Sequence, residues 1–235
     1  MKLNIMIDNY VRLVGIVDSL YYVYENLIIK TDRYKNLNKI NLNKKRVDDI
    51  FSDYIVDKKF NDYIQFYINS FNNVFFTNDF KVDSILVQIE EGIYFVKQAR
   101  YRIKSPESIM NKLAKYTDRK ENGKIKINKC LNDLFGIRFI IDDYNKLRRE
   151  FIDYLDIRVN QEIGFRNKIK LTSKGYNNID SPYIADHVYF SSRLNNNIFP
   201  IELQIWDSVN LERNEKSHVI YKREYTNWAD QYNDI

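Results

Sequence analysis

The segment from Arg102 to Leu113 combines a predicted helix start with basic side chains. Ser105 suits the N-cap of a helix and Pro106 its first position, so we expect a helix to begin there. The unpaired amides at a helix start attract anions. Four side chains around this start could hold a phosphate group: Arg102, Lys104, Ser108 and Lys112. The same residues also fit a capped surface helix whose lysines are only solvated.

Two acidic residues lie in or next to predicted strands. In the run 201–206 apolar and polar residues alternate, which puts Glu202 and Gln204 together on one face of a strand. Asp133 precedes the apolar run 136–141. Two carboxylates from separate strands can hold Mg²⁺ against a triphosphate, and one of them can accept a proton from an attacking hydroxyl. Alternation is also the ordinary pattern of a strand with one solvated face.

The elements around these residues predict a mixed α+β or α/β fold, of which we choose α+β. We expect a mixed β-sheet of about 4–5 strands with helices around it and helical additions at both ends, because strand-like and helical runs alternate in the second half. The predicted strands are 136–141, 156–159, 187–190 and 200–206. The predicted helices lie within 8–30, 46–98, 146–154 and 210–226, and a polar loop is predicted at 37–46.

Composition limits the class of protein. The 235 residues are enough for one main domain with its own core. A net charge of +5 favours polyanionic partners without proving one. Cys130 is the only cysteine, and His187 and His218 are the only histidines, which leaves no cluster with zinc-ligand spacing. No apolar stretch reaches the ~20 residues of a membrane span and no secretory signal is visible, so we expect a cytoplasmic protein without membrane contact.

Taken in chain order, these motifs resemble the synthetase domain of RelA/SpoT enzymes and small alarmone synthetases. The motifs are Arg102-Ile103-Lys104 with Ser108 and Lys112, Asp133 to Arg138, Glu202 to Ile205, and the closing His218 with Tyr221-Lys222. The resemblance covers residues 98 to 225. It implies a nucleotidyltransferase-like sheet in a pyrophosphokinase domain over 99–235 with a C-terminal helix, and leaves 1–98 as a helical N-terminal extension.

The resemblance also implies a role for each matched residue. Pyrophosphate would move from ATP to a nucleotide 3′-hydroxyl, with Asp133 and Glu202 holding Mg²⁺ and Glu202 acting as the catalytic base. ATP would lie against the side chains at the helix start, which are Arg102, Lys104, Ser108 and Lys112. Arg138 and Gln204 would support the site on the acceptor side.

The acceptor loop departs from the family pattern, in which a Gly-Tyr dipeptide is followed by a His four residues after the Tyr. Tyr176 keeps the Gly but has Asp180 at the position of the His. Tyr183 keeps the spacing to His187 but lacks the Gly. We prefer Tyr183 and His187 as the acceptor-binding pair, because His187 opens the strand that precedes the Glu202 strand. Plain packing is the competing interpretation, since the chain holds 19 Tyr.

Three hypotheses about the acceptor remain open. One is a small alarmone synthetase that uses GDP or GTP. Another is a toxin-type relative that modifies the 3′ end of tRNA, with a neutralising antitoxin protein as a partner. The divergent loop and Lys168, Lys170 and Lys174 slightly favour it, since lysine contacts to phosphates dominate nucleic-acid affinity. The third is an inactive nucleotide-binding module, which the retention of both Asp133 and Glu202 disfavours.

Overall fold

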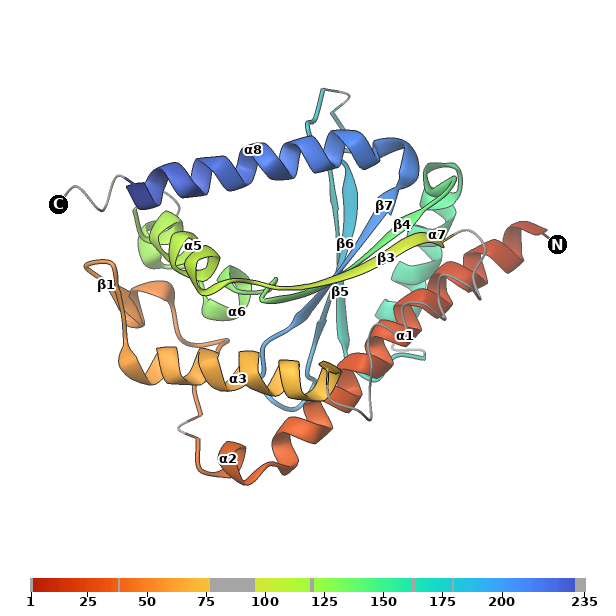
Figure 1. Ribbon diagram of the computed structural model, residues 1–235. Helices are drawn as coiled ribbons and strands as arrows, with labels where there is room; N and C mark the ends of the chain where they lie inside the picture. The colour runs from red at the N-terminus through yellow and green to blue at the C-terminus, as the bar shows by residue number, and fades with distance from the viewer. Residues whose placement is uncertain are drawn as a thin grey trace.

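The computed structural model describes residues 2–37, 39–76, 96–118, 121–161, 164–178 and 180–230. A five-stranded mixed β-sheet forms its centre, and helices lie around the sheet (Figure 1). This confirms the predicted α+β class and the predicted mixed sheet. A separate two-stranded hairpin lies before the main sheet in the chain.

The N-terminal part is mostly helical, and the strands of the main sheet follow it. The helices are α1 (Lys2–Lys30), α2 (Asp32–Lys35), α3 (Lys58–Phe76), α5 (Pro106–Asp118), α6 (Ile127–Cys130), α7 (Tyr144–Asn160) and α8 (Leu211–Asp230). The strands are β1 (Phe51–Ser52), β2 (Ile55–Val56), β3 (Val96–Ile103), β4 (Phe135–Ile141), β5 (Lys168–Lys174), β6 (Ala185–Ser191) and β7 (Ile201–Asp207). Within the ranges described, no helix combines the length and apolarity that crossing a bilayer requires.

The main sheet has the strand order β3-β4-β7-β6-β5, so the last strand in the chain lies at its centre. β4 and β7 run parallel, and the other neighbours run antiparallel. The strands predicted at 136–141, 187–190 and 200–206 correspond to β4, β6 and β7. The two edge strands, β3 and β5, were not predicted, because basic residues interrupt their apolar alternation.

The strand predicted at 156–159 is wrong, because these residues continue α7. Tyr144, Phe151 and Leu155 are the buried side chains of this helix, and their spacing follows one helical face. Ile157 suggested a strand because it is β-branched, but its side chain is exposed on the helix surface. The packing of the buried face therefore outweighs the weak strand propensity of single residues.

The helical pattern predicted over 46–98 holds for α3 but not for the residues before it, nor for residues 96–98, which begin β3. The segment 47–57 forms a short 3₁₀ turn and the β1–β2 hairpin. Asp53 and Tyr54 have φ angles of 49° and 59°, which suit a tight hairpin turn and are excluded from a helix. Residues 77–95, also within the predicted helical range, lie outside the described part of the chain.

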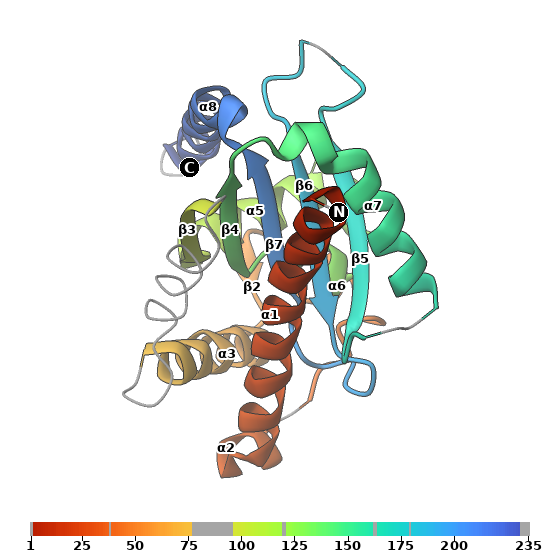
Figure 2. The ribbon, with the colours of Figure 1, turned by 90° about the vertical axis from the view of Figure 1, so that its right-hand side faces the viewer.

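One face of the sheet is apolar and packs against α1 and α7 (Figure 2). Its buried side chains include Ile137, Phe139, Val188, Leu203 and Ile205. The ring of Phe135 stacks on that of Phe71 in α3, with 4.1 Å between the centroids, and meets the ring of Tyr24 in α1 at 5.8 Å. The sheet and the N-terminal helices therefore share one core. The domain boundary at residue 98 stays a prediction.

Two buried acids of α1 hold the ends of β5 and β6. Asp18 accepts hydrogen bonds from the backbone N–H groups of Arg166 at 2.8 Å and Asn167 at 3.1 Å, and from Nδ2 of Asn167 at 2.9 Å. About two turns further along α1, Glu25 accepts a hydrogen bond from the hydroxyl of Ser192. The first helix thus determines where β5 begins and where β6 ends.

Candidate active site

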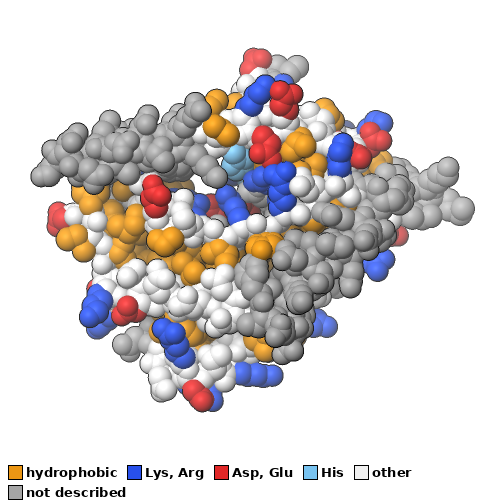
Figure 3. Space-filling view, viewed as in Figure 1, with side chains coloured by type: hydrophobic (Ala, Val, Ile, Leu, Met, Phe, Trp, Pro, Cys, Tyr) orange, Lys and Arg blue, Asp and Glu red, His pale blue; other side chains and the backbone are white. Residues whose placement is uncertain are grey.

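The other face of the sheet carries polar side chains that the strand register brings together. One row crosses β3, β4, β7 and β6 as Arg102, Gly136, Glu202 and Tyr189. The neighbouring row on the same face contains Arg100, Arg138, Gln204 and His187. Figure 3 shows a histidine side chain in a recess below α8, with basic and acidic side chains around it.

Gly136 lets the side chain of Arg102 pass over β4. A β-carbon at Gly136 would lie 3.2 Å from Nε and 3.3 Å from Cγ of Arg102. Beyond the glycine, Nη2 of Arg102 lies 3.2 Å from Oε2 of Glu202 and 3.6 Å from Oδ2 of Asp133. One guanidinium therefore bridges the two predicted acids.

Asp133 lies in the turn before β4, where two lysines bind it. Lys104, just after β3, donates to Oδ2 at 2.9 Å, and Lys112 of α5 donates to Oδ1 at 2.8 Å. Burial would raise the pKa of Asp133, but the charges of Lys112, Lys104 and Arg102 outweigh burial and hold this pKa well below its usual range. Asp133 is therefore ionised at neutral pH.

The start of α5 has the predicted cap. Ser105 Oγ accepts a hydrogen bond from the backbone N–H of Ser108 at 3.2 Å, as the side chain of an N-cap does. The Ser105 hydroxyl also lies 2.9 Å from Ser108 Oγ. Ser108 is partly buried and contacts its own cap rather than Asp133. Lys112, about one turn later, is the side chain of this helix that reaches the acid.

Glu202 is almost completely buried, and both of its carboxylate oxygens have partners. His187 Nδ1 lies 2.7 Å from Oε1, and Gln204 Nε2 donates to Oε2 at 2.8 Å. Burial would raise the pKa of Glu202, but the hydrogen bond from His187 and the charge of Arg102 help to lower it to about 2. Glu202 is therefore a carboxylate held in one orientation.

Tyr183 contacts the ring nitrogen of His187 that does not contact Glu202. The Tyr183 hydroxyl lies 3.1 Å from His187 Nε2 and accepts a hydrogen bond from Trp206 Nε1, also at 3.1 Å. His187 in turn contacts Glu202, so a chain of hydrogen bonds runs from Trp206 to the acid. The structure thus brings Tyr183 and His187 together beside Glu202. That they bind an acceptor stays a prediction.

Tyr176, the alternative acceptor residue, lies on the α7 side of the sheet. The guanidinium of Arg148 in α7 stacks on its ring, 3.5 Å from the ring centroid. Arg148 also binds Asp186 of β6, with 2.7 Å between Nε and Oδ2. Asp186 pairs with Ile205, a residue of the apolar face. Tyr176 is therefore separated from Glu202 by the sheet.

Arg138 and Gln204 extend the site towards α8. Arg138 Nε donates to Gln204 Oε1 at 3.0 Å, and Gln204 Nε2 in turn donates to Glu202 Oε2. The guanidinium of Arg138 lies 3.6 Å from the ring centroid of Trp206, and its Nη2 is 3.2 Å from Nε2 of His218. Burial lowers the pKa of Arg138 to about 10, so this residue remains a cation at neutral pH.

Lys174, predicted to bind the acceptor, lies apart from the acids. It is exposed at the end of β5, pairs with Ala185, and no contact in the described ranges joins it to Glu202. Tyr221 and Lys222, which completed the sequence resemblance, have side chains outside the described part of the chain.

Tyr189 lies at the site although the sequence did not predict a role for it. It pairs with Glu202, and its ring lies 6.2 Å from that of His187 at an interplanar angle of 21°. Burial and the charge of Glu202 raise the pKa of Tyr189. The alternation of His187 and Tyr189 was the available signal, but only the register of β6 on β7 shows that Tyr189 adjoins the acid.

Comparison with known proteins gives a limited structural likeness. No protein-family model and no curated protein matches the sequence. Among solved structures, a GTP pyrophosphokinase family protein from Streptococcus pneumoniae is 18% identical with a TM-score of 0.44, over 74% of this chain and 80% of that chain. Small alarmone synthetase 2 from Bacillus subtilis is 19% identical with a TM-score of 0.38, over 62% and 75%.

Small alarmone synthetase 1 from Bacillus subtilis, bound to its product pppGpp, is a third similar structure. It is 15% identical with a TM-score of 0.39, over 62% of this chain and 76% of that chain. Likeness at these identities and scores does not assign the chain to a family. The case for a function rests on the side chains of the site.

The two acids have the chemistry of a Mg²⁺ site. Asp133 and Glu202 offer carboxylate oxygens, which Mg²⁺ prefers, and both oxygens lie within 3.6 Å of the same Arg102 nitrogen. Within the described ranges, no group of three or more His, Cys, Asp and Glu side chains could hold a metal by itself. Mg²⁺ bound here would therefore need water and phosphate oxygens as its remaining ligands, as is usual beside nucleotides.

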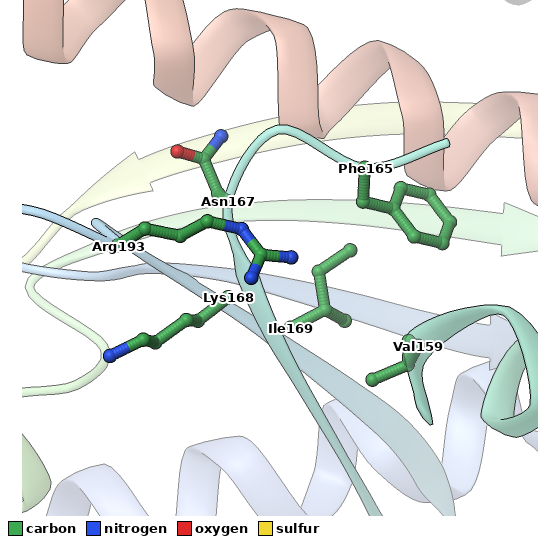
Figure 4. Close-up of a pocket in the computed structure, with 6 residues that line it drawn as sticks. All are labelled: Val159, Phe165, Asn167, Lys168, Ile169 and Arg193. Carbon is green, nitrogen blue, oxygen red and sulfur yellow. The ribbon is translucent and has the colours of Figure 1, made fainter. Parts of the chain in front are cut away.

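A separate hollow of about 130 Å³ lies at the start of β5 (Figure 4). Its lining residues are Val159, Phe165, Asn167, Lys168, Ile169 and Arg193. None of them belongs to the cluster around Asp133 and Glu202. This hollow and the cluster of charged side chains therefore lie in different places, and the hydrogen bonds favour the acid cluster as the candidate active site.

Proposed function

We propose that this chain is an ATP-dependent pyrophosphokinase, which moves the β,γ-diphosphate of ATP to a nucleotide 3′-hydroxyl. The observation that carries the proposal is that the single guanidinium of Arg102 joins the partly buried carboxylate of Asp133 to the buried carboxylate of Glu202, with two lysines on Asp133. Cations beside carboxylates suit a polyphosphate that arrives with a metal ion. The sequence resemblance to RelA/SpoT synthetases supports the same reaction.

The donor side would use the cations that now bind the acids. Arg102, Lys104 and Lys112 have their charged groups within 3.6 Å of carboxylate oxygens, and the phosphates of ATP would share or replace these contacts. Asp133 and Glu202 would hold Mg²⁺ with a phosphate oxygen as a further ligand. The metal, when bound, neutralises charge on the phosphates.

The acceptor side would use Glu202 as the proton acceptor. The acceptor 3′-oxygen forms a bond to the β-phosphorus, the bond from that phosphorus to the oxygen of the α-phosphate breaks, and AMP leaves. A carboxylate with a pKa of about 2 is a weak base, so it takes the proton only as bonding to phosphorus makes the hydroxyl acidic. His187 and Gln204 keep the carboxylate oriented for this step.

For the acceptor we slightly favour the 3′ end of a tRNA, with GDP or GTP as the alternative. The altered acceptor loop around Tyr183 and the lysines of β5 support the larger acceptor. A neutralising antitoxin protein belongs to the tRNA hypothesis and not to the alternative. A nucleotide-binding module without activity is the second alternative.

Incubation with γ-labelled ATP tests these hypotheses directly. GDP, GTP and deacylated tRNA are offered separately to the wild type, to Glu202→Gln and to Glu212→Gln, an exposed acid of α8 that serves as the control. Label on an acceptor with wild type and Glu212→Gln, but not with Glu202→Gln, supports the pyrophosphokinase. Label on tRNA alone would rule out the alarmone synthetase, and label on no acceptor with any variant would rule out both enzymatic hypotheses.

A further inference from the structure

The lysines of β5 face the same side of the sheet as Glu202. Lys168, Lys170 and Lys174 occupy alternate positions of the strand, so their side chains share one face. Lys170 pairs with Tyr189, and Tyr189 pairs with Glu202. One continuous row therefore runs from the acid on the central strand, across an aromatic residue, to a lysine on the edge strand.

These lysines are open to solvent and uncompensated by acids. Each of the three is exposed, and none forms an ion pair with a residue that the structure describes. Between residues 164 and 178 the chain contains four basic residues and no acidic one. Asp186, the acid of the neighbouring strand, bonds to Arg148 on the opposite side of the sheet. These three residues, Lys168, Lys170 and Lys174, form a lysine stripe whose charges no acid in the described ranges neutralises.

A further cation lies at the end of the stripe that is distant from α8. Lys168 pairs with Ser191 at the end of β6, and Arg193 follows two residues later. Figure 4 shows Lys168 and Arg193 at the same hollow, which also has apolar walls. Lys168 and Arg193 therefore place two cations near the start of the edge strand β5.

Tyr189 supplies an aromatic surface between the acid and the lysines. Its side chain is only partly buried, and it stands on the sheet face where nucleic-acid-binding sheets present rings to bases. Base stacking on such rings, combined with a cationic track for the phosphates, is the usual way in which proteins bind single-stranded nucleic acid without reading its sequence.

We propose that this row binds the single-stranded 3′ end of an RNA, with the terminal hydroxyl at Glu202, a base on Tyr189 and the preceding phosphates at Lys170 and Lys168. β5 lies two strand spacings from β7, or about 10 Å, which a chain of more than one nucleotide must span. Lys170 and Lys168 are about 7 Å apart along β5, close to the spacing of successive phosphates in an extended strand. The assignment rests on the proposed function, since it uses Glu202 as the place of the reacting hydroxyl.

The test is a binding measurement that needs neither ATP nor turnover. An eight-nucleotide single-stranded RNA with a free 3′-hydroxyl and a 5′ fluorophore is titrated with protein, and anisotropy gives the dissociation constant at several salt concentrations. The test variant is Lys168→Glu with Lys170→Glu. The matched control is Lys58→Glu with Lys59→Glu, two exposed lysines of α3 that give the same change in net charge.

We expect the β5 variant to bind the RNA at least tenfold more weakly, and the α3 control to bind within about twofold of wild type. The slope of log K against log salt should fall in magnitude by about 1.4 when two phosphate contacts are lost. Equal weakening by both double variants, or weakening by neither, would overturn the proposal. Wild-type protein that binds no RNA would also overturn it.

Tyr189 gives a second, independent measurement. Tyr189→Phe keeps the ring and should bind the RNA as wild type does, whereas Tyr189→Ala should bind at least tenfold more weakly. Equal binding by both variants would remove Tyr189 from the proposal. Failure of the RNA to bind leaves pyrophosphate transfer to GDP or GTP possible, whereas failure of all transfer with intact RNA binding would reject the proposed function alone.

Discussion

The side chain of Arg102 lies across Gly136, with Nε only 3.2 Å from the position that a β-carbon would occupy there. The glycine is needed for space and not for an unusual backbone conformation. Without a side chain on β4 at this point, the guanidinium of β3 reaches Glu202 of β7. The bridge between the two acids therefore depends on the absence of one methyl group.

Gly136→Ala should impair transfer more than it impairs folding. The added methyl displaces Arg102 by a few tenths of an ångström, and we expect the transfer rate to fall about tenfold, or 1.4 kcal/mol in the barrier. Gly15→Ala is the matched control, because a β-carbon at Gly15 meets nothing within 4 Å. Steady-state rates and thermal unfolding measure the two effects. An unchanged rate in Gly136→Ala would show that the position of Arg102 is not critical.

The pKa of Glu202 predicts a pH dependence of stability. A folded-state pKa of about 2, below the ordinary 4.5, means that ionised Glu202 favours the folded state above pH 4.5 and loses this effect as the pH falls towards 2. The difference in unfolding free energy between wild type and Glu202→Gln should be constant from pH 7 to 5. It should then shrink by on the order of 2–3 kcal/mol. Denaturant titrations in the presence of a chelator measure this difference. A difference that stays constant down to pH 2 would contradict the prediction.

Lys112→Met should weaken ATP binding. The variant keeps the length of the side chain but removes one of the cations on Asp133. A hydrogen bond to a charged group contributes roughly 1.5–3 kcal/mol, so the dissociation constant for a non-hydrolysable ATP analogue should rise about 10- to 100-fold. Calorimetry measures the change, and Lys129→Met, an exposed lysine of α6, should leave it unaltered. Equal affinities in the two variants would exclude Lys112 from the ATP site.

Asp18→Ala should destabilise the whole fold. It leaves the buried amides at the start of β5 without their acceptor, and the expected cost is about 3 kcal/mol of unfolding free energy. Asp32→Ala removes an exposed acid that pairs with Lys35, and should change stability by less than about 0.5 kcal/mol. Urea denaturation compares the two variants. A loss in Asp18→Ala no larger than in the control would show that α1 does not anchor β5.

Much of the sheet was predictable from the sequence, because strands with one apolar face show it directly. The alternation around Glu202 predicted β7, and the apolar run after Asp133 predicted β4. β5 was missed because Lys168 and Lys170 fill the positions that face solvent on an edge strand, which leaves too few apolar residues for a recognisable pattern. The alternation of apolar residues in a sequence reflects which side chains are buried. Few side chains of an edge strand are buried, so its pattern is weak.

The site was predictable residue by residue but not as an arrangement. Asp133, Glu202 and the cations could be selected by type and order. That Arg102 joins the two acids depends on the register of three strands, and so does the position of Tyr189 beside Glu202. The choice between Tyr183 and Tyr176 likewise needed the sheet, which places them on opposite sides.

The central position of β7 has a consequence for how the protein is made. The hairpin-like pair β3–β4 and the pair β5–β6 have no ladder between them until β7, the last strand in the chain, inserts in the middle. Such long-range pairing forms slowly and late. A nascent chain that stops before residue 201 therefore holds the cations and Asp133 but has two unconnected half-sheets and no catalytic base, so interrupted synthesis should release only inert fragments.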